Sequence, residues 1–292
     1  MRARALLRVL SVSRRLAGFF IEPHRGNVLA TYDRSCYLNL DGQIVALVAP
    51  ALLNGPLNLV VEMDAWQDRV APGAVAASSG IEIGLHDAAV WDATLRAWPE
   101  EQFPTLRRHL PTLQRLLDME APEGGLARAV SRPNASTTAL ERRAEAAIVE
   151  LARGLQRRDA ILVSRAAGAL AGMGPGLTPS GDDVLVGGLL AFALHADDSR
   201  VMRQAIISAV RDRTTRISMA YLEAAARGEA SESWHRLVAA LASHEAERIA
   251  IAARGVMAFG ETSGSDMLAG FLLTLDALLP QNAERRTQNA DS

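Results

Sequence analysis

The hydrophobic pattern of the chain changes character between its two halves. Up to about residue 121, short apolar segments alternate with turn residues, and helical periodicity is scarce. Asp41-Gly42 separates two of these segments and is a strong hairpin signal. Short strands at this spacing are typical of a small barrel or sandwich. The predicted strands cover residues 28–32, 36–40, 43–48, 58–62 and 80–84.

From about residue 135 onward, apolar residues recur at helical spacing. Ser136 and Asp198 stand where they can cap two of the predicted helices. A last helix is predicted from about 265 to 279, ended by Pro280. We therefore expect an α+β fold, with a β-rich domain at 1–121, a Pro- and Gly-rich linker at 122–134, an all-helical domain at 135–280 and a disordered tail at 281–292.

Composition excludes several classes of protein. The 292 residues are 49% hydrophobic, which suits about two domains with ordinary cores. A net charge of −2 gives no long-range attraction for nucleic acid or anionic membranes, and no apolar run approaches the ~20 residues that span a bilayer. Cys36 is the only cysteine, so neither an internal disulfide nor a cysteine-based zinc cluster is expected. These features predict a soluble cytoplasmic protein.

The basic N-terminal segment allows two interpretations. It contains no acid before Glu22, as in a transit peptide. However, Arg14-Arg15 interrupts the apolar stretch, and no small-residue cleavage site follows cleanly. We therefore interpret it as an ordinary first element of the domain.

The chain contains no lysine, so all 31 of its Lys and Arg positions are arginine. This excludes a P-loop lysine, a Schiff-base lysine and a pyridoxal phosphate anchor. The six histidines show no metal-ligand spacing. We accordingly expect neither a metal nor an organic cofactor, and any bound anion must be held by arginine, backbone N–H groups or hydroxyls.

A glycine- and proline-rich segment, Gly174–Asp183, separates two helical patterns. A new helix is predicted to begin at about Gly181, with Ser180 as its N-cap and Asp182 and Asp183 in its first turn. The unpaired N–H groups at a helix start make a ready anion site. The alternative is that these residues only cap the helix, although the run of glycines and prolines is more than a cap needs.

A related segment occurs 83 positions later, because the pattern Ser-Gly-x-Asp-x-Leu-x-Gly begins at both Ser180 and Ser263. In each copy the acid, Asp183 or Asp266, lies one helical turn from a glycine on the same face. Glycine on a helix face lets another backbone approach closely, so we expect the two helices to pack side by side with converging starts. The hydroxyls expected around the resulting polar pocket are those of Thr178, Ser180, Thr262 and Ser263.

The Gly174–Asp183 motif resembles the signature of a family long labelled as a domain of unknown function, which includes AllH, a subunit of oxamate carbamoyltransferase in allantoin breakdown. Further segments that resemble this family are 213–218, Tyr221-Leu222, 262–266 and, more loosely, 38–40 and Gly55-Pro56. The resemblance implies phosphorolysis of oxalurate to oxamate and carbamoyl phosphate. It also implies two partner subunits, namely an FdrA-like relative of acyl-CoA synthetases and a second protein.

The expected site residues fall into two groups. Asp182, Asp183 and Asp266 are the candidate catalytic acids. Arg213 and Arg216 are candidates to reach a bound anion, with a solvated helix face as the alternative. The candidate substrate-binding residues are Gly174, Gly176, Thr178, Ser180, Gly181, Arg213, Thr214, Thr215, Arg216, Thr262, Ser263 and Gly264.

Three functions remain open at the level of sequence. The first is a subunit of a heteromeric carbamoyltransferase that supplies a site for a small carboxylate or phosphate. The second is a hydrolase whose aspartates hold Mg²⁺ or Mn²⁺ through hard oxygen ligands. The third is a non-catalytic assembly or sensor subunit. Paired aspartates at a helix start suit a ligand's N–H groups, a metal or a cap, so the residues alone leave the choice open.

Overall fold

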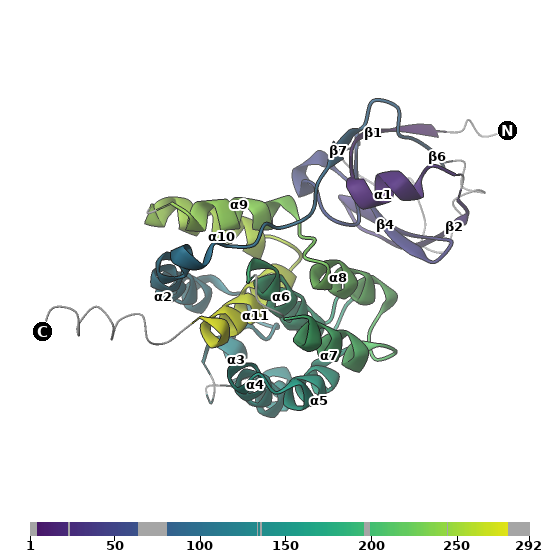
Figure 1. Ribbon diagram of the computed structural model, residues 1–292. Coiled ribbons are helices and arrows are strands. Elements are labelled where there is room, and N and C mark those ends of the chain that lie inside the picture. The colour runs from purple at the N-terminus through teal and green to yellow at the C-terminus, as the bar shows by residue number, and fades with distance from the viewer. Residues whose placement is uncertain are drawn as a thin grey trace, which may run out of the picture. The chain divides into compact units, whose positions relative to one another are not determined.

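The chain forms two compact units in a computed structural model, which describes residues 5–22, 24–63, 81–132, 134, 136–195, 199–243 and 245–279. One unit holds the chain up to Thr94 together with Glu229–Glu232, and the other holds the remainder. The first contains the strands and the second contains most of the helices (Figure 1). The expected α+β class, with a β-rich N-terminal region followed by a helical one, is confirmed.

A single mixed sheet forms the β-rich unit. Its strand order is β2-β3-β4-β5-β1-β6, and β7 pairs with β1. Asp41 and Gly42 join β3 to β4 with positive φ angles of 46° and 89°, as a tight hairpin requires. The elements are β1 (Ala5–Ser13), α1 (Arg14–Phe19), β2 (Gly26–Thr31), β3 (Ser35–Leu40), β4 (Gln43–Val48), β5 (Asn58–Val61), β6 (Ile81–Gly84) and β7 (Ala89–Trp91).

The basic N-terminal segment contributes an interior strand to this sheet. β1 pairs antiparallel with β5 and parallel with both β6 and β7. Its apolar residues Val9 and Val12 lie in the core of the sheet. From Ala5 onward, this segment is therefore a first element of the domain, as interpreted. Asp198, Pro280 and the expected tail at 281–292 lie outside the described residues.

The helical unit begins earlier in the chain than the hydrophobic pattern indicated. The elements are α2 (Phe103–Glu120), α3 (Ala127–Ser131), α4 (Ala139–Arg157), α5 (Ala160–Leu170), α6 (Ser180–Leu194), α7 (Arg200–Val210), α8 (Arg216–Ala226), α9 (Glu232–Leu241), α10 (Ala246–Met257) and α11 (Ser263–Leu278). None of the helices in the described ranges is long and apolar enough to cross a membrane.

Helix α2 lies in the region where helical patterns seemed scarce. It carries a proline in its first turn and another, Pro111, inside the helix. An internal proline removes one backbone hydrogen bond, but here it is outweighed by a stripe of buried leucines that includes Leu106, Leu113 and Leu117. These leucines are buried, and α2 contacts α3, α10 and α11 of the helical unit. The two units divide between Thr94 and Leu95, before α2 begins. Part of the expected linker at 122–134 is itself helical, as α3.

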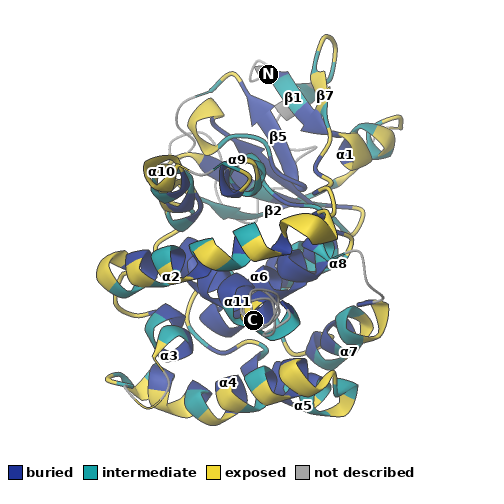
Figure 2. Cartoon of the chain, turned by 60° about the vertical axis from the view of Figure 1, so that its left-hand side comes forward, coloured by how far each residue is buried: buried dark blue, intermediate teal, exposed yellow. Residues whose placement is uncertain are grey.

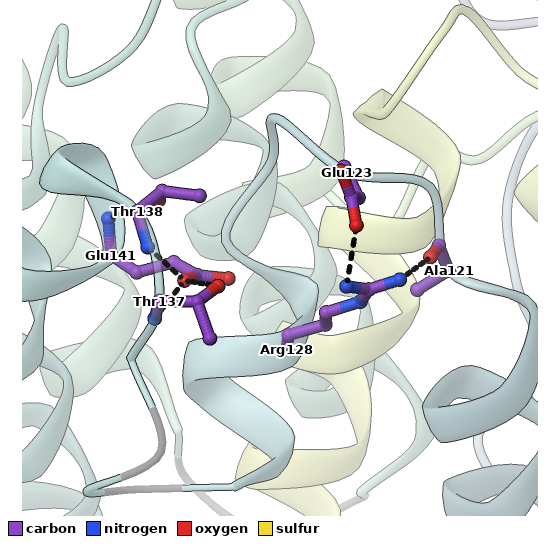
Figure 3. Close-up of polar contacts among 6 residues, drawn as sticks. All are labelled: Ala121, Glu123, Arg128, Thr137, Thr138 and Glu141. Carbon is purple, nitrogen blue, oxygen red and sulfur yellow. Dashed lines mark hydrogen bonds and ion pairs between the residues drawn. The ribbon is translucent and has the colours of Figure 1, made fainter.

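The start of α4 corrects one predicted cap. Thr138, and not Ser136, is the N-cap. Its hydroxyl accepts from the backbone N–H of Glu141, and the Glu141 carboxylate accepts from the backbone of Thr137 and Thr138 (Figure 3). This reciprocal arrangement is a capping box, and it needs a glutamate three residues after the cap, which Ser136 does not have.

Helices α6 and α11 form the centre of the helical unit. They lie side by side, and 14 of the 15 residues of α6 and 12 of the 16 residues of α11 are buried (Figure 2). A helix that is apolar on all sides is stable only when other helices surround it. The polar residues at the starts of these two helices are therefore buried as well, and they make up the candidate site.

Candidate functional site

Two glycines allow the backbones of α6 and α11 to touch. A Cβ added at Gly187 would lie 1.8 Å from the carbonyl oxygen of Met267, and one added at Gly270 would lie 1.9 Å from the carbonyl oxygen of Val184. The two contacts are reciprocal, because each joins matching positions of the two Ser-Gly-x-Asp-x-Leu-x-Gly copies. The predicted side-by-side packing of these helices is therefore present in the structure.

The helix starts differ from the prediction in one respect that matters for the site. Ser180 is the first residue of α6, and the N-cap is Pro179, which offers no side-chain cap. Likewise Ser263 is the first residue of α11, after Thr262, whose hydroxyl makes no capping hydrogen bond. Ser180 is thus not a cap. The hydroxyl of Ser263 instead lies 3.1 Å from that of Thr178, which brings the glycine-rich loop against α11.

Asp183 and Asp266 are buried almost completely at these helix starts, with exposed fractions of 1% and 0%. Burial raises the pKa of Asp266 to about 6, against the opposing effect of the hydroxyls of Ser180 and Thr262 and of two backbone amides. Burial also raises the pKa of Asp183 well above its ordinary value, and the negative charges of Asp266 and Asp182 add to the rise. Within the described residues, the Oδ2 atoms of Asp183 and Asp266 accept no hydrogen bond.

Asp266 is held by a turn that the sequence did not identify as part of the site. Its Oδ1 accepts hydrogen bonds of 2.7 Å from the backbone N–H groups of both Leu126 and Ala127. Gly125 makes this approach possible, because a Cβ there would lie 2.6 Å from Asp266 Oδ1. The Gly124-Gly125 pair was the available signal, since adjacent glycines mark a backbone that comes close to something else.

Arg128 fixes the shape of this turn. Its guanidinium donates to the Glu123 carboxylate and to the backbone carbonyl of Ala121, both at 3.3 Å (Figure 3). These contacts join the end of α2 to α3 and support the two amides that hold Asp266. A segment predicted to be a linker thus positions a site residue.

Asp182 has a different role from the other two acids. Its Oδ1 accepts from the backbone N–H of Gly172 at 2.9 Å, and its Oδ2 accepts from the hydroxyl of Thr214. Burial raises its pKa, and these hydrogen bonds oppose the rise. Both carboxylate oxygens of Asp182 thus accept a hydrogen bond from the protein itself, and Asp182 joins the glycine-rich loop to the segment that contains Thr214.

The segment Arg213–Arg216 reaches the glycine-rich loop through its threonines. Thr214 donates to Asp182, and Thr215 donates to the Leu177 carbonyl while capping α8. The guanidinium of Arg213 is exposed and donates to the Gly168 carbonyl, and Arg216 is exposed at the first position of α8. The side chains of both arginines are thus exposed in the structure.

The glycines of both helix starts are needed for backbone geometry. Gly174 and Gly176 have φ angles of +118° and +92°, a region that other residues rarely adopt. A Cβ at Gly181 would lie 2.1 Å from the Leu170 carbonyl oxygen, and a Cβ at Gly264 would lie 2.1 Å from that of Val256. Each of these two helices therefore begins in backbone contact with the helix that precedes it.

Two cavities lie away from these acids. One of about 200 Å³ is lined by Ser13, Arg14, Asp92 and neighbouring residues of the β-rich unit. The other, of about 120 Å³, is lined by Phe192, His195 and neighbouring residues of the helical unit. The described part of the chain contains no cluster of three or more His, Cys, Asp or Glu residues that would hold a metal ion.

Comparison with known proteins identifies the segment that holds both helix starts. No solved structure matches the chain. A family model described as oxamate carbamoyltransferase subunit AllH matches residues 170–275. This match begins at the end of α5 and runs to the last turn of α11, so it includes Asp183 and Asp266. The resemblance to the AllH family that the Gly174–Asp183 motif predicts is thus confirmed over residues 170–275.

Proposed function

We propose that this chain is a subunit of a heteromeric oxamate carbamoyltransferase and that the starts of α6 and α11 bind a small ligand of that reaction. The ligands in question are oxalurate, oxamate, phosphate and carbamoyl phosphate. The observation that carries the proposal is the pair of buried carboxyl groups, Asp183 and Asp266, each with one oxygen that accepts no hydrogen bond within the described residues. Burying a carboxyl oxygen without a hydrogen-bond partner is unfavourable. Two such oxygens at neighbouring helix starts are therefore typical of a site in which a ligand supplies the missing hydrogen bonds.

The electrostatics of the pair suit a small ligand with both polar donors and negative charge. A negatively charged ligand would be repelled by two ionised carboxylates, and burial, which raises the pKa of Asp183 well above its ordinary value, opposes ionisation of the second acid. The neighbouring helix starts contribute partial positive charge. Serine and threonine hydroxyls, which both donate and accept, complete the surroundings.

Access to the pair is through the glycine-rich loop. Pro175 and Gly176 at its tip are exposed, whereas Ser180 below them is buried. The contact between the hydroxyls of Thr178 and Ser263 joins this loop to α11. In the proposed function, the ligand enters when this contact opens, and the two hydroxyls then face the ligand.

The partner subunits of the proposed complex are an FdrA-like relative of acyl-CoA synthetases and a second protein. In this proposal, carbamoyl transfer requires residues of the partner subunits as well as those of this chain. We therefore expect the purified chain to show little or no turnover of oxalurate and phosphate, and addition of the partners to restore it. Robust turnover by the chain alone would contradict the assignment as a dependent subunit.

A metal-dependent hydrolase is the competing function, because the free oxygens of Asp183 and Asp266 would also suit Mg²⁺ or Mn²⁺. Calorimetric titration of the full chain with oxamate, with and without chelator, separates the two. We expect binding that is unchanged by chelator. Binding that requires Mg²⁺ or Mn²⁺ would favour the hydrolase, and the absence of binding for oxamate and phosphate alike would leave a purely structural role.

A further inference from the structure

Asp183 and Asp266 occupy matching positions in the two helix starts, but their surroundings are not equivalent. Asp266 Oδ1 accepts from the amides of Leu126 and Ala127 at 2.7 Å. No backbone amide of the described residues donates to Asp183, which is affected by the hydroxyl of Ser263 and by the charges of Asp266 and Asp182. The turn before α3 thus breaks the symmetry between the two acids.

This asymmetry decides where a proton resides. Two amide donors stabilise the ionised form of a carboxyl group. Two neighbouring buried carboxyl groups do not ionise together readily, so the second proton is retained. The pKa of Asp266 is about 6, and that of Asp183 is raised well above its ordinary value. Of the two acids, Asp266 is therefore the one that ionises first, and Asp183 is the one that retains its proton to higher pH.

We propose that Asp183 and Asp266 together recognise the H₂N–C=O group of a primary amide or ureido ligand. The O–H of the protonated Asp183 carboxyl group is the donor of this pair, and the Asp266 carboxylate is the acceptor. The proposal rests on the proposed function and specifies which end of the ligand enters the site. A primary amide presents a carbonyl oxygen and an N–H on the same edge. The carbonyl accepts from Asp183, and the N–H donates to Asp266 Oδ2, the oxygen that accepts no hydrogen bond within the described residues.

A carboxylate ligand does not satisfy this pair. It has only acceptor oxygens, so one of them would face the ionised Asp266 oxygen. Oxamate has a primary amide at one end and a carboxylate at the other, whereas oxalate has a carboxylate at both. The two ligands are nearly equal in size and differ only in the replacement of the amide by a second, negatively charged carboxylate, and we expect the full chain to bind oxamate at least 10-fold more tightly than oxalate at pH 7.5.

Asp183→Asn and Asp266→Asn are matched variants, because each removes one carboxyl oxygen from one of two equivalent positions. In Asp183→Asn, the N–H₂ group of the new amide still donates to the ligand carbonyl, so oxamate binding should weaken about 3-fold or less. In Asp266→Asn, a donor replaces the acceptor that faces the ligand N–H, so the loss should be 30-fold or more. Circular dichroism establishes that both variants are folded.

The pH dependence of the wild-type chain gives an independent readout. Oxamate affinity should fall as the pH drops through about 6, where Asp266 takes up a proton. Equal effects of the two variants, a larger effect of Asp183→Asn, or binding of oxalate as tight as that of oxamate would each overturn the inference while leaving a small-ligand site in place. Failure of oxamate, oxalate and phosphate to bind at any pH would overturn the proposed function as well.

Discussion

Gly187 of α6 and Gly270 of α11 each lie against the backbone of the other helix, at equivalent positions of a repeated pattern. The distances that a Cβ would have from the facing carbonyl oxygens, 1.8 and 1.9 Å, differ by only 0.1 Å. Since each glycine is one helical turn from an acid, the same contact that joins the helices also sets the separation of Asp183 and Asp266. The geometry of the site thus depends on two residues that have no side chain.

Gly187→Ala should destabilise the chain strongly, because its Cβ would meet main-chain atoms of α11 that move only if the helices separate. We expect a loss of about 3 kcal/mol in the free energy of unfolding, at the upper end for overpacking. The control is Gly255→Ala in α10, where a Cβ meets nothing within 4 Å. There the gain in helix propensity should stabilise the chain by roughly 0.5–1 kcal/mol. Urea unfolding measures both, and a neutral Gly187→Ala would show that the helices do not touch.

Thr214→Val should destabilise the glycine-rich loop. The substitution keeps the shape of the side chain but leaves Asp182 Oδ2 buried without the hydroxyl that donates to it. Loss of a hydrogen-bond partner to a buried polar group costs about 1–3 kcal/mol. Thr214→Ser retains the hydroxyl and should remain close to wild type. If both variants unfold at the same urea concentration as wild type, the contact between Thr214 and Asp182 has no role in stability.

The stability of the chain should depend on pH through Asp183 and Asp266. Both acids have a pKa above the ordinary Asp value in the folded state. Between the ordinary pKa and the folded-state pKa of each acid, the folded state therefore binds more protons than the unfolded state. Their contribution is therefore largest below the ordinary pKa of 3.8 and is lost as the pH rises through about 6 for Asp266. The rise in the pKa of Asp266 from 3.8 to about 6 corresponds to roughly 3 kcal/mol in the free energy of unfolding.

Thermal unfolding of wild type and Asp266→Asn between pH 4.5 and 8 tests this pH dependence. The variant lacks the titration, so its melting temperature relative to wild type should increase with pH across this range. Subtracting the melting temperature of wild type from that of the variant at each pH removes the contribution of the other acids, which titrate in both proteins. A difference that stays constant with pH would mean that Asp266 has an ordinary pKa in the folded chain.

The start of α4 provides a prediction that is independent of the site. Thr138→Ala removes the cap hydroxyl and should cost about 1 kcal/mol. Ser136→Ala should have no destabilising effect, because the Ser136 hydroxyl is buried without a hydrogen-bond partner among the described residues. The urea midpoints of the two variants show which residue caps α4. A larger loss of stability for Ser136→Ala than for Thr138→Ala would identify Ser136 as the cap.

The sequence by itself determined those features that follow from local chemistry. The hairpin at Asp41-Gly42 is encoded in two residues that tolerate positive φ, and each Ser-Gly-x-Asp helix start is encoded in its glycine and its first-turn acid. The pairing of α6 with α11 was also predictable, because a glycine one turn from each acid leaves a gap that only another backbone fills.

Only the tertiary structure decided what each polar group contacts. Asp182 and Asp183 are adjacent in sequence, yet they lie in different surroundings on the helix, so both oxygens of Asp182 accept a hydrogen bond whereas Oδ2 of Asp183 accepts none from the described residues. Ser180 looked like a cap, but Pro179 holds that position, which leaves the serine hydroxyl free to face Asp266. The amides of Leu126 and Ala127 are not themselves marked in the sequence, since every residue except proline carries an N–H, and only the preceding Gly124-Gly125 pair signals a close approach of the backbone. Their contact with Asp266, 140 and 139 residues away, exists only because the packing of α3 on α11 brings them together.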